Sequence, residues 1–167
     1  MAQTEISSSS AFPPILLEGL TPAPNIVSAA ALLVSTDGRY LFQLRDDKPL
    51  LPLRNHWGLF GGAVETGEDG RAAILREIEE ELNYKARDCT WYHEAIFVLP
   101  MRNNRVVRRS FYLMHMLPDD IDDMTLNVGA EMRLMTPQEL TGLRRVAPWD
   151  LSAVLLHARE KTLFADG

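Results

Sequence analysis

The amino-acid sequence predicts one globular domain of mixed α/β (α+β) class, and three features of its 167 residues support this prediction. The run Ile26–Val34 is small and apolar almost throughout, which is typical of a strand. Within Arg71–Leu82, the apolar residues Ile74, Ile78 and Leu82 recur four positions apart, which predicts an amphipathic helix. Hydrophobic residues make up 46% of the chain and charged residues 24%, the composition of a globular protein rather than a disordered one.

The first residues of the chain differ in composition from the rest. Residues 1–25 are rich in Ser, Thr and Pro, including the run Ser7–Ser10 and the prolines at Pro13 and Pro22. This composition is typical of a flexible arm. The remaining sequence contains no repeat and no interior linker, so we expect a flexible N-terminal arm followed by a single domain over residues 26–167.

Turn residues divide the first half of the domain into elements. Asp37 and Gly38 separate the first apolar run from a second one at Tyr40–Leu44, and an Asp-Gly pair in that position is a strong signal for a hairpin. Charged residues and prolines then predict a loop over Asp46–Asn55, followed by a short apolar element at Trp57–Phe60.

Beyond the helix, the pattern predicts two more strands, at Thr90–Leu99 and Val106–Leu117, and a short element at Met132–Met135. Thr136, followed by Pro and with Glu at the capping-box position, predicts the start of a helix. A last helix is expected over Pro148–Thr162. The residues expected to face inward on this helix are Leu151, Val154, Leu155 and Ala158.

The net charge and the cysteine content indicate which partners and which compartment to expect. The net charge of −6 repels the backbone of nucleic acids on average, which disfavours long nucleic acid as a partner. Cys89 is the only cysteine, so no intrachain disulfide can form, and the reducing cytosol is the expected compartment. No run reaches the roughly 18 apolar residues that span a bilayer, and no signal-peptide pattern is present. We therefore expect a cytoplasmic protein without a membrane partner.

The predicted helix carries an unusual density of glutamates. Glu77, Glu80 and Glu81 share one flank, because residues three and four apart are neighbours on a helix surface. Like charges at this spacing destabilise an isolated helix by roughly 0.2–0.5 kcal/mol per pair, and a divalent cation is a natural compensation. Mg²⁺ prefers a few carboxylates together with substrate phosphates. The alternative is a solvated acidic face, which spacing alone favours.

The whole segment Gly62–Tyr84 favours the metal site over the solvated face, because it resembles the Nudix box. That pattern runs Gly, five residues, Glu, seven residues, then Arg-Glu-aliphatic-any-Glu-Glu-any-Gly-aliphatic. The residues that fall on the pattern are Gly62, Glu68, Arg76, Glu77, Ile78, Glu80 and Glu81. Six fixed positions would match by chance at about 10⁻⁸ per start point. Asn83 replaces the late glycine, but it can adopt the same left-handed conformation. Phe60 stands where a proline is common before the paired glycines.

The resemblance implies an α/β/α sandwich with a central mixed sheet, in which the box forms a loop, a helix and a second loop. It implies Mg²⁺ or Mn²⁺ as the cofactor. The metal ligands that it implies are Glu77, Glu80, Glu81 and the carbonyl of Gly62. Glu68 and Arg76 would form a structural brace between the loop and the helix.

The resemblance also implies a reaction. A divalent-metal-dependent hydrolase of this family splits the pyrophosphate bond of a nucleoside diphosphate linked to another moiety, with water attacking phosphorus. The alternative is a module on the same scaffold that senses a nucleotide or nucleotide sugar without cleaving it. Isomerisation of a prenyl diphosphate is disfavoured, because Cys89 lies beyond the helix. A homodimer is one possible assembly.

Residues outside the box complete the expected site. Relatives often take a general base from a late loop, so Glu131 is the candidate to act with Glu80 and Glu81, and an exposed loop acid is the alternative. Arg45 and Arg109 are candidates to bind the phosphates of a small nucleotide substrate.

The remaining candidates for substrate binding are an arginine patch and Trp57, and each has a structural alternative. Arg109 belongs to a patch with Arg102, Arg105 and Arg108 around a turn at Asn103 and Asn104, and a solvated hairpin is the alternative there. Trp57 could line the pocket or belong to the core, and Trp91 and Trp149 are expected to pack. Substrate selectivity is expected in the loops at Asp46–Asn55 and Pro118–Gly129.

Overall fold

The computed structural model describes residues 24–99 and 105–164, so most of the expected N-terminal arm lies outside the described residues. Six strands form one sheet in the order β3-β2-β1-β5-β4, with β6 paired to β2. The strands are β1 (Ile26–Ser35), β2 (Tyr40–Leu44), β3 (Trp57–Gly58), β4 (Thr90–Leu99), β5 (Arg105–Met116) and β6 (Glu131–Met135). The helices are α2 (Gly70–Leu82), the 3-10 helix η2 (Pro118–Asp123), α3 (Pro137–Gly142) and α4 (Pro148–Phe164).

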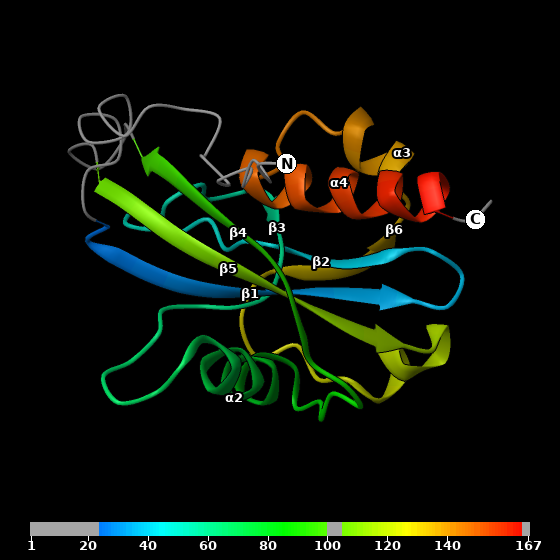
Figure 1. The fold of residues 1–167 in the computed structure, drawn as a ribbon, viewed down its shortest axis with the longest axis horizontal. Helices are drawn as coiled ribbons and strands as arrows, with labels where there is room; N and C mark the ends of the chain where they lie inside the picture. Colours follow the sequence, from blue (N-terminus) through cyan, green and yellow to red (C-terminus); the bar gives the residue numbers. More distant parts are fainter. Residues whose placement is uncertain (1–23, 100–104, 165–167) are drawn as a thin grey trace, which may run out of the picture.

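Figure 1 shows α2 on one face of the sheet and α3 and α4 on the other, which confirms the expected α/β/α sandwich. The sheet is mixed, because β1 runs parallel to β5 and antiparallel to β2. None of the described helices is long and apolar enough to cross a bilayer.

Strand β1 lies at the centre of the fold and is buried on both faces. Three of its side chains pack into the cluster beneath α2, and the alternate three pack into the cluster beneath α4. The first set is Ala29, Ala31 and Leu33, and the second is Ala30, Leu32 and Val34. Burial on both faces explains why this strand reads as a continuous apolar run instead of an alternating pattern.

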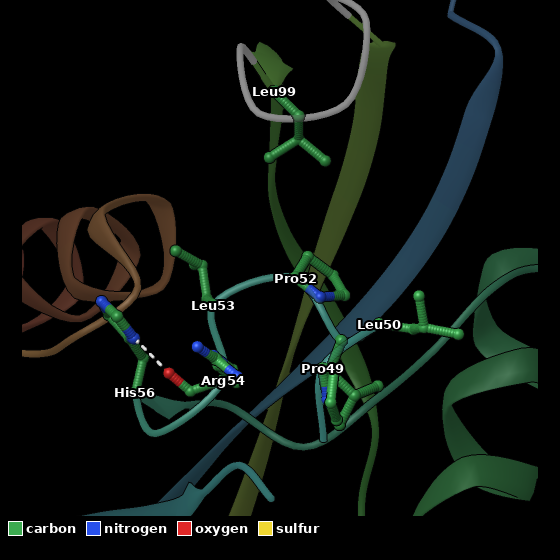
Figure 2. Close-up of a pocket in the computed structure, with 8 residues that line it drawn as sticks. Pro49, Leu50, Pro52, Leu53, Arg54, His56 and Leu99 are labelled. Carbon is green, nitrogen blue, oxygen red and sulfur yellow. Dashed lines mark hydrogen bonds between the residues drawn. The ribbon is translucent and has the colours of Figure 1, made fainter. Parts of the chain in front are cut away.

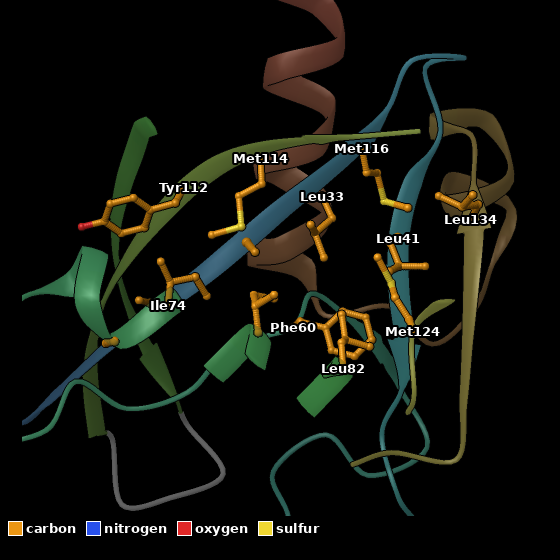
Figure 3. Close-up of a cluster of buried hydrophobic side chains, with 14 residues drawn as sticks. Leu33, Leu41, Phe60, Ile74, Leu82, Tyr112, Met114, Met116, Met124 and Leu134 are labelled. Carbon is orange, nitrogen blue, oxygen red and sulfur yellow. The ribbon is translucent and has the colours of Figure 1, made fainter. Parts of the chain in front are cut away.

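Helix α2 confirms the amphipathic pattern in the sequence. Ile74, Ile78 and Leu82 are fully buried in the cluster beneath α2, shown in Figure 3. The Asp69 side chain caps the first turn by accepting a hydrogen bond from the Ala72 backbone N–H at 2.8 Å. Asn83 ends the helix with φ 49° and ψ 35°, so it adopts the left-handed conformation expected of it.

The hairpin between β1 and β2 forms at the expected place, although only one of its two turn residues takes a positive φ. Gly38 has φ 86°, whereas Asp37 uses its side chain to accept a hydrogen bond from the Arg39 side chain at 2.8 Å. This bond lowers the pKa of Asp37 to about 2. The turn is therefore stabilised by a local ion pair as well as by glycine.

Two expectations about packing are wrong. Leu155 was expected to face inward on α4, but it is exposed, and the buried positions include Val154 and His157. The buried His157 ring makes a hydrogen bond with the Tyr40 hydroxyl at 2.8 Å, so a satisfied polar residue occupies the inner face. Trp91 was also expected to pack, yet it is exposed on β4, which lies at the edge of the sheet order.

Candidate active site

The site begins at the glycine loop beside β1. The Phe60 carbonyl accepts a hydrogen bond from the Ala31 N–H at 3.0 Å, and the Gly62 carbonyl accepts one from the Ala29 N–H at 2.9 Å. Gly61 has φ 132°, and a Cβ there would overlap the Ala29 carbonyl oxygen, so only glycine fits this approach. The Gly62 carbonyl, expected as a metal ligand, keeps a second lone pair for another partner.

Glu81 is the buried carboxylate of the site. Its Oε2 accepts a hydrogen bond from the Gly61 N–H at 2.9 Å, and the Gln43 side chain also bonds to it. Burial raises the pKa of Glu81 to about 7, and the charge of Glu77 adds to this rise. The Gly61 and Gln43 hydrogen bonds and the charge of Arg45 oppose it. Without a bound cation, Glu81 is therefore harder to ionise than an exposed glutamate.

The other two glutamates of this flank are progressively more exposed to solvent than Glu81. Gly62 leaves room for the Glu77 carboxylate, which would overlap any Cβ at that position. The Glu77 side chain is 17% exposed and that of Glu80 is 61% exposed. Helix α2 thus presents one buried, one partly buried and one exposed carboxylate along the flank that the spacing predicted.

Arg76 connects the helix to the preceding loop. Its guanidinium donates from Nη2 to Glu68 Oε1 at 2.8 Å and to the Ala63 carbonyl at 3.2 Å. Its Nη1 donates to Glu77 at 2.9 Å and to Glu80 at 3.3 Å. Arg76 therefore pairs with Glu68, the partner that the resemblance implies, and also with Glu77 and Glu80 of the helix itself.

The donor set fits a divalent cation chemically. Among the described residues, no three His, Cys, Asp or Glu side chains already converge as metal ligands. Glu77 and Glu80 instead share the Arg76 guanidinium. Three carboxylates beside a loop carbonyl are nevertheless the hard oxygen donors that Mg²⁺ or Mn²⁺ takes. The charge of Glu77 disfavours ionisation of Glu81, and a cation between them would relieve this repulsion.

A cavity of about 210 Å³ adjoins the glycine loop and holds both arginines that were expected to bind substrate. Arg109 donates from Nε to Asp150 Oδ1 at 3.1 Å, and Arg45 donates from Nε to the Pro52 carbonyl at 3.2 Å. Burial and the nearby charge of Arg109 both lower the pKa of Arg45. Two cations and one buried carboxylate thus give the cavity a positive character suited to phosphate.

Aromatic rings form one wall of this cavity. Phe97 and Trp149 stack with ring centroids 4.3 Å apart and an interplanar angle of 10°, and both line the cavity. Trp149 therefore faces the cavity, where the sequence suggested packing alone. Trp57 is instead buried in the cluster beneath α4, with the Arg133 guanidinium 5.1 Å from its ring centroid, and it does not line this cavity.

The loop at Asp46–Asn55 forms a second cavity, of about 440 Å³, which Figure 2 shows. Pro52, Leu53 and Leu99 line both this cavity and the one that holds the arginines, so the two cavities adjoin. The loop expected to control selectivity therefore borders the space beside the glycine loop.

The structure does not bring Glu131 to the helix glutamates. Side chains alternate along β6, and Met132 and Leu134 pack into the cluster beneath α2, so Glu131 projects from the opposite face. Its carboxylate accepts a hydrogen bond from Arg133 Nη2 at 2.6 Å. Arg102 and the turn at residues 103 and 104 lie outside the described residues.

Sequence reasoning missed three residues of the site. Gln43 is a buried amide within the apolar run of β2, and that polar interruption was a usable signal. Asp150 looks like an ordinary acid in the first turn of a helix, and Phe97 looks like a core residue of a strand. Their shared place at one cavity follows only from the tertiary structure.

The fold and the site together define a class: an α/β/α sandwich in which a glycine loop, an acidic helix and a cavity lined by two arginines lie next to one another. A family model described as the NUDIX domain matches residues 24–160 of this chain. The chain therefore belongs to the NUDIX domain family, as its resemblance to the Nudix box predicted.

Curated relatives match a shorter segment. Nucleoside triphosphatase NudI of Escherichia coli is 45% identical over 51 residues, which are 30% of this chain and 35% of the relative. The enzyme of the same name from Escherichia fergusonii is 44% identical over 54 residues, 32% of this chain and 37% of the relative. The chain thus spans about a third of the length of the curated relatives that it matches.

Solved structures share the fold over most of the chain. The MutT protein of Methanosarcina mazei Go1 has a TM-score of 0.70 at 19% identity, and the alignment covers 84% of this chain and 98% of that one. A Caenorhabditis elegans Ap4A hydrolase has a TM-score of 0.64 at 17% identity, covering 83% and 99%. The Escherichia coli dihydroneopterin triphosphate pyrophosphohydrolase has a TM-score of 0.66 at 17% identity, covering 80% and 95%.

Proposed function

We propose that this protein hydrolyses the pyrophosphate bond of a nucleoside diphosphate linked to another moiety, by attack of water on phosphorus, with Mg²⁺ or Mn²⁺ as cofactor. The observation that carries the proposal is the juxtaposition of α2 and the cavity. Glu77 and Glu81 lie against Gly62 and Gly61, and these two glycines line the cavity that contains the arginines.

The carboxylates of α2 would hold the metal. Glu77, Glu80 and Glu81 are the proposed ligands, together with the Gly62 carbonyl. When bound, the cation neutralises pyrophosphate oxygens and lowers the pKa of the attacking water. Glu81 is the proposed proton acceptor, because its carboxylate is held against the glycine loop that lines the cavity. Glu131 is less suited, because its carboxylate is paired with Arg133 on the opposite face of the sheet.

The cavity would bind the substrate itself. Arg45 and Arg109 are proposed to bind the phosphates, since a guanidinium pairs with phosphate oxygens through two parallel hydrogen bonds. Phe97 and Trp149 are proposed to stack against a nucleobase, which contributes roughly 1–3 kcal/mol per base. The proposed partner is therefore a small nucleotide in the cytoplasm.

A panel of nucleotides and one pterin triphosphate tests the proposal. The panel contains nucleoside triphosphates, dinucleoside polyphosphates, nucleotide sugars and dihydroneopterin triphosphate, and release of phosphate, pyrophosphate or nucleoside monophosphate is measured. We expect turnover of at least one class with millimolar Mg²⁺ or Mn²⁺, and a fall of at least about 100-fold when EDTA replaces the metal. Tight nucleotide binding without turnover of any member would contradict the enzyme and favour the sensing module.

Alanine at the two loop glycines is expected to separate activity from stability. In Gly62→Ala the three atoms nearest to the new Cβ all belong to the flexible Glu77 side chain, so the free energy of unfolding should change by less than about 1 kcal/mol while kcat falls about tenfold. Gly61→Ala meets backbone atoms of Ala29 and Ala30 at a positive φ, so stability should fall by about 1–3 kcal/mol or more. Denaturant unfolding and steady-state kinetics of both variants test this; equal stability in the two would contradict it.

A further inference from the structure

The C-terminal end of α2 is capped by a segment that lies more than 40 residues further along the chain. The last four carbonyls of an α-helix have no partner within the helix. In α2 all four accept a hydrogen bond. The Glu79 carbonyl accepts from the Asn83 N–H at 2.9 Å, and the Leu82 carbonyl accepts from the Thr125 N–H at 2.9 Å. The Glu80 carbonyl accepts from Nδ2 of Asn127 at 2.8 Å, and the Glu81 carbonyl accepts from the Asn127 N–H at 2.8 Å.

Asn127 has a special place in this cap, because it holds the backbone of two consecutive glutamates of the proposed site. Its backbone N–H bonds to the Glu81 carbonyl, and its side-chain amide bonds to the Glu80 carbonyl. Of the four donors, this amide is the one that comes from a side chain. Thr125 contributes through its backbone, and its own side chain is exposed.

The same loop is fixed at its other end to β2, next to the buried partner of Glu81. The Ala130 N–H donates to the Leu44 carbonyl at 2.8 Å. Gly129 has φ 100°, and a Cβ there would lie 2.9 Å from Gln43 Oε1. Gln43 in turn hydrogen-bonds to Glu81. The segment from Asn127 to Ala130 therefore joins the end of the acidic helix to the strand beside it.

We propose that Asn127 is a positioning residue for the hydrolysis: by holding the Glu80 carbonyl, its amide fixes the last turn of α2 and thereby the places of the Glu80 and Glu81 carboxylates. Helix ends fray when they are not capped. A displacement of about 1 Å in a catalytic site can lower a rate by about 100-fold. This inference rests on the proposed function, and it assigns Asn127 no contact with substrate.

Three single variants test the proposal. Asn127→Ala removes the side-chain donor and keeps the backbone bond to Glu81. Asn127→Asp keeps the shape but turns a carboxylate oxygen towards the Glu80 carbonyl oxygen. Thr125→Ala is the matched control, because it removes an exposed side chain from the same loop and keeps the backbone donor.

The measurements are kcat, KM and Mn²⁺ affinity, the last by electron paramagnetic resonance of free Mn²⁺ without substrate. Asn127→Ala should lower kcat and Mn²⁺ affinity about tenfold each, and Asn127→Asp should lower both further. KM should stay within about twofold of wild type, since the proposal gives Asn127 a positioning role and no contact with substrate. Thr125→Ala should match wild type in all three quantities.

Several results would overturn the proposal. Wild-type kcat and Mn²⁺ affinity in a folded Asn127→Asp protein would show that the amide does not position the carboxylates. A rise in KM alone would assign the loop to substrate binding instead. Equal losses in Thr125→Ala would indicate general damage to the loop. Absence of metal-dependent turnover in the wild type would contradict the proposed function, whereas the Mn²⁺ titration would still decide the role of Asn127.

Discussion

Glu81→Gln is expected to lower kcat by about 10²–10⁴-fold without unfolding the protein. Glutamine has the same shape as glutamate. Its amide oxygen can still accept the hydrogen bond that Glu81 accepts from the Gly61 N–H at 2.9 Å. The variant loses the negative charge that the metal requires and the site that accepts the proton. Steady-state kinetics in saturating Mg²⁺, with thermal unfolding of the same preparation, measure both consequences.

Glu79→Gln is the matched control for this variant. Glu79 lies in the same helix two residues earlier, but its side chain is exposed and pairs with Lys85 at 3.6 Å. Its replacement should leave kcat within about twofold of wild type, as is usual for exposed positions away from a site. Retention of more than about a tenth of wild-type kcat by Glu81→Gln would contradict the role proposed for this carboxylate.

Arg109→Met is expected to lower the free energy of unfolding by about 3–5 kcal/mol, because it removes the cation that is hydrogen-bonded to the buried Asp150 carboxylate and leaves only the more distant charge of Arg45. The Arg109 side chain is 11% exposed and that of Asp150 is 4% exposed. Burial raises the pKa of Asp150, and the charge of Arg109 opposes this rise. Denaturant unfolding of wild type and variant at neutral pH gives the difference in stability.

A double variant separates the ion pair from the loss of side-chain contacts. Arg109→Met combined with Asp150→Asn removes both charges and keeps an acceptor for the Leu59 N–H, which bonds to Asp150 at 3.0 Å. It should recover most of the lost stability. The deficit of the single variant should also shrink as pH falls through the raised pKa of Asp150, because a protonated carboxyl group needs no cation. Equal stability of the single and double variants, or a deficit independent of pH, would contradict this account.

The parts of the fold that the sequence predicted correctly depend on local signals. Thr136 caps α3 by accepting a hydrogen bond from the Glu139 N–H, and the Glu139 side chain bonds back to Thr136 as the capping-box pattern predicts. Asn83 ends α2 in the left-handed conformation for an equally local reason. Helix periodicity alone places Glu77, Glu80 and Glu81 on one flank, so this shared flank could be predicted without tertiary information.

The parts that could not be predicted depend on contacts between distant segments. Asp150 bonds to a backbone N–H that lies 91 residues away in the sequence. Arg109 meets Asp150 across 41 residues, so neither the pairing nor the shared cavity leaves a local pattern. The inner face of α4 could not be predicted either, because the polar His157 is buried and the apolar Leu155 is exposed. His157 can be buried because its ring makes a hydrogen bond with the Tyr40 hydroxyl. Tertiary partners, rather than local preference, decide these positions.

Hydrolysis in ¹⁸O-labelled water tests the central claim most directly. A substrate that turns over in the panel is hydrolysed with Mg²⁺ and with EDTA, and the products are analysed by mass spectrometry. If water attacks phosphorus with the help of the metal, ¹⁸O enters one of the two phosphate-containing products, and labelling in EDTA falls by at least about 100-fold. Incorporation of ¹⁸O into a product that carries no phosphate, or an equal rate of labelling without metal, would contradict the account.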